Sequence, residues 1–352
     1  MSSRILVYGA YGYTGTLVTD ALLARGIEPL LCGRRAGPLE RLATSRGLAH
    51  AVVDLADGAA LDRSLREVEA VLHCAGPFSK TARPMIDACL RAGVHYLDVT
   101  GEIPVLEAAA RRGVEARSRG VMVMPAVGFD VVPTDCLAAH VSRRLPGATL
   151  LRLAVTGLEF ATRGSAKTLL EHADRTIFVR RGGALCRVPM LSDHPSFDFG
   201  AGPTSTVNVS WGDVATAYYT TGIPNIRVYF DRTPRLMAMS LAGRWLGPLL
   251  RTGAAQAYMK AHAELLPVGL GAAERARISM RIVAEATRED GARAVSRLRT
   301  PEAYTFTGTS AAAIGERVLA GDYEPGFQTP GRVYGPDFVL GLGDIHREDL
   351  DG

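Results

Sequence analysis

The chain has 352 residues, of which 47% are hydrophobic and 22% are charged, and its formal net charge is +4. These values are typical of a globular protein long enough for two domains, and they exclude a disordered or fibrous chain. Nearly all of the positive charge is arginine, scattered singly or in pairs without interleaved aromatic residues, so no nucleic-acid partner is expected.

The five cysteines are widely spaced and include no Cys-x-x-Cys pair. Dispersed thiols in odd number favour a reducing compartment, and the amino terminus lacks the uninterrupted apolar run of a signal peptide. The most apolar later stretch, 236–250, is shorter than a bilayer crossing. We therefore expect a cytoplasmic protein without a membrane span. The eight histidines form no His-x-x-x-His pair, so no metal site is expected.

A dinucleotide-binding turn is predicted at the start of the chain. An apolar strand-like run at 5–8 leads into Gly9, Gly12 and Gly15, and a helix is expected over 17–25. Gly9 permits a sharp turn, Gly12 leaves no Cβ between the backbone and a pyrophosphate, and Gly15 lets the helix lie close to the sheet. The helix N-terminus then offers N–H groups to the phosphates. The predicted cofactor-binding residues here are Gly9, Ala10, Tyr11, Gly12, Tyr13, Thr14 and Gly15.

A second strand, 28–32, ends at Gly33, Arg34 and Arg35. NAD-preferring domains usually place an acid here to accept from the ribose 2′-hydroxyl, whereas an arginine meets the 2′-phosphate of NADP. We therefore expect NADP(H) as the cofactor, with an ordinary exposed arginine pair as the alternative. Asp54, at the end of a third strand over 50–54, is expected near the adenine.

Further strand–helix alternation extends the predicted sheet. A fourth strand, 70–75, ends in the turn Ala75-Gly76-Pro77, whose small residues would let the nicotinamide ribose approach the backbone. A fifth strand at 94–99, a helix at 104–119 and a sixth strand at 121–127 follow. This order predicts an α/β fold, a Rossmann-type doubly wound parallel sheet.

The pattern changes to strands after residue 128. Strands are expected at 150–156, 206–211, 226–230, 278–285 and 292–298, the last two joined across Asp290-Gly291, with a helical insertion at 234–266. We therefore predict an NADP-binding domain at 1–128 and an α+β substrate or dimerisation domain at 129–305. The segment 306–352 is expected to return to the Rossmann domain.

Reduction by hydride transfer requires a source of protons beside the nicotinamide. Lys167, one of three lysines, is expected at the start of a helix near the cleft, where partial burial would bring its pKa into a useful range. The alternative for Lys167 is an exposed lysine. Glu102 and Asp130 are further candidates because both lie on loops at the carboxyl edge of the sheet, although Asp130 is also suited to bracing its loop.

Two substrate classes remain open from the residues. The apolar stretch 236–266 is suited to lining a pocket for an acyl chain, and equally to forming a buried helix or the contact of a homodimer. A polar pocket would instead use Arg163, Arg227 and Arg232 to bind carboxylates. A non-catalytic protein that senses NADPH or binds a partner is the alternative to an enzyme.

The sequence resembles the saccharopine-dehydrogenase-like NAD(P)-binding oxidoreductases. The matching stretches are 9–15, 74–78, 96–102, 128–135 and 326–330. The resemblance implies a Rossmann domain followed by a catalytic α+β domain, and reduction of a C=N or C=C bond. Some members act on amino-acid-derived imines, and others are similar to trans-acting enoyl reductases. The second domain lacks recognisable residues for a dicarboxylic amino acid, so the resemblance does not imply saccharopine itself.

Overall fold

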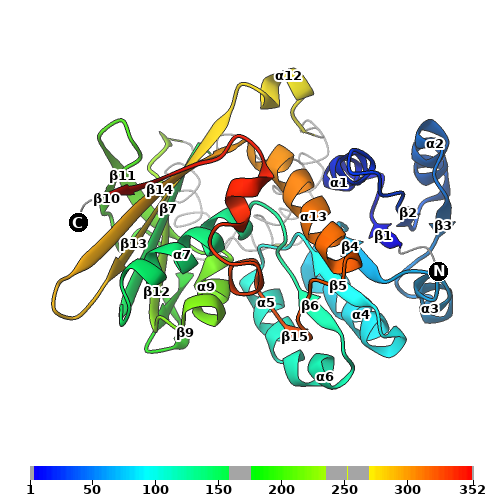
Figure 1. The fold of residues 1–352 in the computed structure, drawn as a ribbon, viewed down its shortest axis with the longest axis horizontal. Coiled ribbons are helices and arrows are strands. Elements are labelled where there is room, and N and C mark those ends of the chain that lie inside the picture. The colour runs from blue at the N-terminus through cyan, green and yellow to red at the C-terminus, as the bar shows by residue number, and fades with distance from the viewer. Residues whose placement is uncertain (1–3, 158–175, 235–251, 253–268, 351–352) are drawn as a thin grey trace. The chain divides into compact units, whose positions relative to one another are not determined.

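The computed structural model describes residues 4–157, 176–234, 252 and 269–350. The chain divides into two compact units, each built around its own sheet (Figure 1). The first unit consists of Met1–Cys136 and Ala303–Gly343, and the second of Leu137–Glu302 and Asp344–Gly352.

The first unit contains a parallel sheet of seven strands in the order β15-β6-β5-β4-β1-β2-β3. Its strands are β1 (Ile5–Tyr8), β2 (Leu30–Gly33), β3 (His50–Val52), β4 (Ala70–His73), β5 (His95–Asp98), β6 (Met122–Met124) and β15 (Gly326–Phe327). The central strands β1 and β4 are buried along their whole length, as expected where helices cover both faces of a parallel sheet. The strand order reverses between β1 and β4, which is where ligands of doubly wound sheets bind. The predicted Rossmann-type fold is confirmed.

The helices of this unit are α1 (Tyr13–Leu23), α2 (Ala36–Arg46), α3 (Gly58–Leu65), α4 (Phe78–Ala92), α5 (Ile103–Ala110), α6 (Gly113–Ser118), α13 (Ala303–Leu319) and α14 (Pro330–Val333), with a 3₁₀ turn at Phe338–Leu342. The prediction of one helix over 104–119 is wrong, because α5 ends and α6 begins within it. The new helix starts where Gly113 meets β15. A Cβ on Gly113 would lie 3.1 Å from the Cβ of Phe327.

The boundary of the first unit lies at Cys136 rather than at 128, because α13 binds the segment that follows β6. The Phe129 N–H donates to Oγ1 of Thr307 at 3.0 Å, and the Ser310 hydroxyl donates to the carbonyl of Val127 at 2.8 Å. The helix itself lies close to α1, since a Cβ on Gly308 would be 3.1 Å from the carbonyl oxygen of Leu17. Residues 303–305 begin this helix, so they belong to the first unit as well.

The second unit contains a mixed sheet in the order β10-β11-β12-β7-β13-β14-β16, with the β8–β9 hairpin joined to β12. Its strands are β7 (Leu150–Thr156), β8 (Thr176–Arg181), β9 (Ala184–Pro189), β10 (Ser196–Asp198), β11 (Pro203–Val209), β12 (Asn225–Asp231), β13 (Ser279–Thr287), β14 (Arg293–Pro301) and β16 (His346–Leu350). Among the described strands of this second sheet, only β7 and β12 pair in parallel, and the other pairs are antiparallel. The helices within the described residues of this unit are α9 (Asp213–Thr221) and α12 (Ala272–Arg275), and α7 (Val132–Arg144) enters from the first unit. The α+β second domain is confirmed.

Two features of this sheet were absent from the sequence prediction. The β8–β9 hairpin turns at Gly182 and Gly183, whose φ values of +53° and +81° suit a tight two-residue turn, and this Gly-Gly pair was the available signal. The strand β16 pairs with β14, so the last residues of the chain join the second unit instead of returning to the first.

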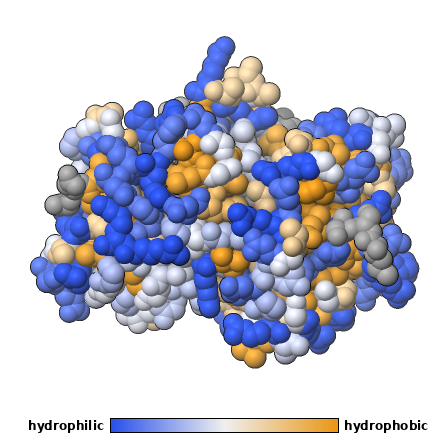
Figure 2. All heavy atoms as spheres, viewed as in Figure 1, coloured by the Kyte–Doolittle hydropathy of each residue, from blue (hydrophilic) through white to orange (hydrophobic). Residues whose placement is uncertain are grey.

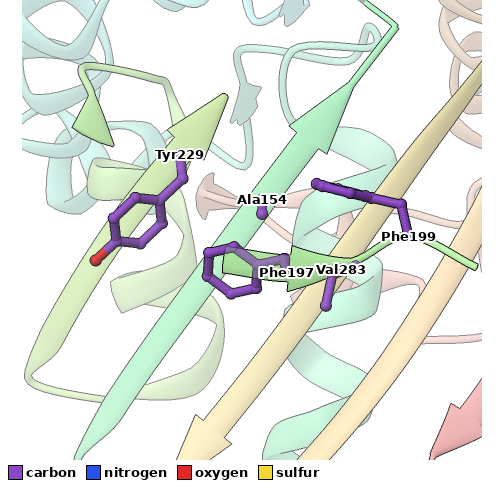
Figure 3. Packing of buried hydrophobic residues seen from close by; sticks show 5 residues of the cluster. All are labelled: Ala154, Phe197, Phe199, Tyr229 and Val283. Atoms are coloured by element: carbon purple, nitrogen blue, oxygen red, sulfur yellow. The ribbon is translucent and has the colours of Figure 1, made fainter. Parts of the chain in front are cut away.

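One face of the second sheet is covered by an aromatic segment at β10. Phe197 and Phe199 pack with Ala154, Tyr229 and Val283 of three neighbouring strands, and all five side chains are buried (Figure 3). Burial of each large apolar side chain contributes about 1.5–3 kcal/mol to stability. The cluster therefore holds the segment before β11 against the sheet.

Candidate functional site

The turn between β1 and α1 contacts the loop after β4. Gly9 has φ +80°, and a Cβ at this position would lie 2.8 Å from the Cβ of Ala75. The Gly9 N–H donates to the carbonyl of Cys32 in β2 at 2.8 Å, and the Ala10 N–H donates to the same oxygen. Glycine at position 9 therefore allows the turn after β1 to contact both the end of β2 and the loop after β4.

The other two glycines of this turn differ in their surroundings. A Cβ on Gly15 would lie 2.3 Å from the carbonyl oxygen of Gly9, so this position is closed by backbone. Among the atoms of the described residues, a Cβ on Gly12 would meet only that same oxygen, at 3.2 Å. Gly12 is the N-cap of α1 and contributes no side-chain cap. The amides at the N-terminus of a helix are a kind of site that suits an anion.

The end of β2 lies against the same turn. A Cβ on Gly33 would be 2.5 Å from Cε1 of Tyr11, and the Arg35 guanidinium carbon lies 5.1 Å from the centroid of the Tyr11 ring. Arg34 and Arg35 are exposed. The structure thus brings Tyr11, Gly33 and Arg35 together at the end of β2. The ribose of a dinucleotide bound to such a domain would lie on this side.

Asp54 is exposed at the end of β3, and its carboxylate accepts from the Ala56 N–H at 2.9 Å. This bond makes a local turn, which is a common role for aspartate after a strand. Its contact with an adenine stays a prediction.

Glu102 caps a helix at the turn Ala75-Gly76-Pro77. Its two carboxylate oxygens accept from the backbone N–H groups of Phe78 and Ser79 at 2.8 and 2.9 Å, and the residue is 6% exposed. A carboxylate at this point is also favoured by the dipole of α4. The contact orients the loop after β4, so Glu102 has a positioning role, and its catalytic role stays a prediction.

Asp98, at the carboxyl end of β5, joins two loops of the site. Its Oδ1 accepts from the Thr100 N–H at 2.9 Å and from the Ala126 N–H at 2.8 Å, while Oδ2 accepts from the Tyr96 hydroxyl at 2.6 Å. Ala126 has φ +61°, a conformation that costs an L-residue about 1–2 kcal/mol. The buried carboxylate therefore holds a strained residue in place. Burial raises the pKa of Asp98 to about 6.

Asp130 lies on the loop after β6, against the loop after β5. A Cβ on Gly101 would be 2.5 Å from its Oδ2, so glycine at 101 makes room for this carboxyl group. Burial raises the pKa of Asp130 to about 7. In the part of the chain that the structure describes, no backbone N–H donates to it, which gives no support to the bracing interpretation.

The remaining candidates fall outside the described residues. Lys167 and Arg163 lie in the range 158–175, and most of the apolar stretch 236–266 lies in the ranges 235–251 and 253–268. Arg227 is in β12, where it forms an ion pair with Asp193.

The described residues contain neither a group of side chains suited to a metal ion nor a helix suited to crossing a membrane. In residues 4–157, 176–234 and 269–350, no three His, Cys, Asp or Glu side chains are grouped to hold a metal ion. Within those same ranges, no helix has the length and hydropathy to cross a bilayer. Hydrophilic and hydrophobic residues are interspersed over the face drawn in Figure 2.

Comparison with known proteins supports a nucleotide-binding first unit. Residues 5–124 match the family of the saccharopine dehydrogenase NADP binding domain. A human saccharopine dehydrogenase-like oxidoreductase is 27% identical over 164 residues, which are 41% of this chain and 38% of the relative. A trans-acting enoyl reductase from Mycobacterium ulcerans is 29% identical over 187 residues, which are 48% of this chain and 44% of the relative. The matches thus span less than half the length of these curated relatives.

Solved structures share the fold of the whole chain. Saccharopine dehydrogenase (L-Glu forming) from Saccharomyces cerevisiae superposes with a TM-score of 0.69 at 12% identity, covering 99% of this chain and 100% of that one. Homospermidine synthase from Legionella pneumophila, solved in complex with NAD, gives 0.68 at 9% identity, covering 100% and 92%. At such identities the likeness concerns the fold. The match to the saccharopine dehydrogenase NADP binding domain family extends over residues 5–124, and beyond it the likeness to these structures is one of fold.

Proposed function

We propose that the protein is an NADPH-dependent oxidoreductase that reduces a C=N or C=C bond by hydride transfer. The observation that carries the proposal is the β1–α1 turn, where the Gly12 position is nearly open while Gly9 and Gly15 are closed by neighbouring atoms. A pyrophosphate fits such a turn because the first-turn amides of α1 point toward it. The names of the relatives, which are oxidoreductases and enoyl reductases, support the reaction class.

The preference for NADPH rests on the arginine pair after β2. Replacing Arg34 and Arg35 together by alanine is expected to weaken NADPH binding about tenfold or more, because a guanidinium on a phosphate is a charge-assisted contact. NADH has no 2′-phosphate, so its affinity should change little. Calorimetric titration with both nucleotides measures the ratio of the affinity for NADPH to the affinity for NADH. An unchanged ratio would show that the pair is only an exposed surface feature.

A nicotinamide held by this turn would supply the hydride for an imine carbon or for the β-carbon of an enoyl group. The chain must then supply a proton to the other atom of the reduced bond. Asp130 is suited to this step because its carboxyl group lies at the carboxyl edge of the sheet and keeps its proton to about pH 7. Lys167 and water remain the other sources.

The pH dependence of turnover tests Asp130. Its raised pKa means that the carboxyl group is protonated below about pH 7, so turnover should fall as the pH rises through that value. In the Asp130→Asn variant, turnover at low pH should drop, and the decrease in turnover near pH 7 should disappear from the pH–rate profile. The Lys167→Met variant is the comparison. If it removes activity while Asp130→Asn does not, the proton comes from Lys167.

A substrate panel separates the two bond types from the sensor alternative. NADPH oxidation is followed with cyclic imines and, separately, with enoyl thioesters of increasing chain length. Turnover with only one of these two substrate classes would identify whether the protein reduces a C=N or a C=C bond. Tight NADPH binding without turnover in either class would favour a sensor or a partner-binding protein.

A further inference from the structure

The second unit contains a cavity of about 470 Å³ on one face of its sheet. Asn208 in β11 pairs with Tyr229 in β12, so their side chains share a face, and Arg227 lies two residues before Tyr229 on that face. These strands form one side of the cavity, and the segment with Asp193 forms another. The volume falls within the range of about 300–1,000 Å³ that is usual for small-molecule sites.

Polar side chains at one side of the cavity are held in place by hydrogen bonds to Asp193. Oδ2 of Asp193 accepts from Nη1 of Arg227 and from the Tyr229 hydroxyl, each at 2.7 Å. This ion pair is half-buried, and it leaves the other guanidinium N–H groups of Arg227 for a further acceptor. The aromatic cluster around Phe197 holds the neighbouring segment against the sheet (Figure 3).

One buried amide lining the cavity is incompletely bonded. Asn208 is 2% exposed, and its Nδ2 donates to the Ser192 hydroxyl at 2.9 Å. Its Oδ1 has no hydrogen-bond partner in the described part of the chain. A buried polar atom left unpaired costs about 1–3 kcal/mol, so a ligand that donates a hydrogen bond here recovers that cost.

The charge of the cavity is positive. Arg180 pairs with Ile226, so Val179 and Arg181 project on the opposite face of β8, which is the face of Arg227. Arg181 is exposed and forms no ion pair with any described residue. Because Asp193 balances Arg227, Arg181 gives the cavity one surplus positive charge.

A second arginine of the same hairpin lies on the other face. Arg187 places its guanidinium carbon 4.9 Å from the ring centroid of Phe178, which alternates with Val179 along β8. The guanidinium charge of Arg187 is therefore directed away from the cavity, although another part of the residue borders the cavity.

We propose that this cavity binds a small carboxylate or phosphate that carries an O–H or N–H donor next to its anionic oxygens. The guanidinium groups of Arg181 and Arg227 receive the anionic oxygens. The O–H or N–H group of the ligand donates a hydrogen bond to Oδ1 of Asn208. The site lies within the second unit and does not rest on the proposed reductase function.

Matched pairs of anions test the required donor and identify its source. Phosphate and sulfate have similar shapes, but phosphate carries an O–H at neutral pH, and malate differs from succinate by one hydroxyl. Calorimetric titration of the full chain should show binding at one site, with phosphate or malate bound about tenfold or more tightly than its partner. Discrimination in the phosphate pair indicates a phosphorylated ligand, and discrimination in the malate pair a hydroxy acid. Absence of saturable binding, or equal binding within both pairs, would overturn the proposal.

A matched pair of variants locates the site. Arg181→Ala should weaken binding of the preferred anion about tenfold or more, whereas Arg187→Ala, with the same change in charge on the other face, should change it by less than about twofold. Both positions are exposed, and thermal unfolding of each variant reports on correct folding. Equal weakening in both variants would mean general charge attraction and would overturn the assignment.

Discussion

Replacing Gly12 by valine is expected to weaken NADPH binding by at least about a hundredfold, or ~3 kcal/mol, while the protein remains folded. The backbone at Gly12 has φ −75° and ψ 163°, values that any L-residue adopts. Of the atoms in the described part of the chain, a Cβ there would meet only one backbone oxygen, at 3.2 Å. The branched side chain would instead occupy the space of the pyrophosphate. Calorimetric titration gives the affinity, and thermal unfolding shows that the fold persists.

Two other glycines provide the comparison. A Cβ on Gly58, at the start of α3, would meet no atom of the described residues within 4 Å, so Gly58→Ala should leave both affinity and stability unchanged. Gly15→Ala should lower stability itself, because its Cβ would lie 2.3 Å from a backbone oxygen. NADPH affinity retained in Gly12→Val would contradict a pyrophosphate at this turn, and with it the proposed function.

Asp98→Ala is expected to destabilise the protein by about 3 kcal/mol or more, the largest stability change that we predict. The variant leaves three buried donors without an acceptor: the Tyr96 hydroxyl and the N–H groups of Thr100 and Ala126. It also releases Ala126 from the conformation at φ +61° that the carboxylate holds. Chemical denaturation of the purified variant measures the loss.

Asp98→Asn should cost much less. Both backbone N–H groups already donate to Oδ1, which an asparagine oxygen replaces, and the new Nδ2 can donate to the Tyr96 oxygen once that hydroxyl turns. Equal losses in the two variants would contradict this bonding scheme.

The pH dependence of stability provides a second check on Asp98. Burial raises its pKa from 3.8 to about 6, so the folded protein binds the proton more tightly than the unfolded chain. Stability therefore falls as the pH rises between about 4 and 6. This contribution should be absent in Asp98→Asn, and an unchanged slope would show that another group is responsible.

Local spacing was sufficient to predict the parallel sheet and the glycine turn between β1 and α1. The bonds that define the turn join residues close in sequence, such as the Gly12 N–H to the Gly9 carbonyl at 3.0 Å and the Thr16 N–H to the Gly12 carbonyl at 2.9 Å. Glycines three residues apart specify such a turn wherever the sheet lies, so the motif was readable without knowledge of the fold. The Asp290-Gly291 hairpin was predicted for the same reason, and the pairing of β13 with β14 confirms it.

The roles of the acidic residues depended on the fold. Glu102 caps α4 at Phe78, 24 residues earlier in the chain, and Asp98 holds Ala126, 28 residues later. The boundary at Cys136 depends on a bond between Phe129 and Thr307, 178 residues apart. The sequence by itself determined the alternation of strands and helices from β1 to β6 and the glycine turn, because those features follow from short-range backbone geometry. Only the tertiary structure decided which carboxylates support loops and which arginines face a cavity, because those partners meet only when the sheets form.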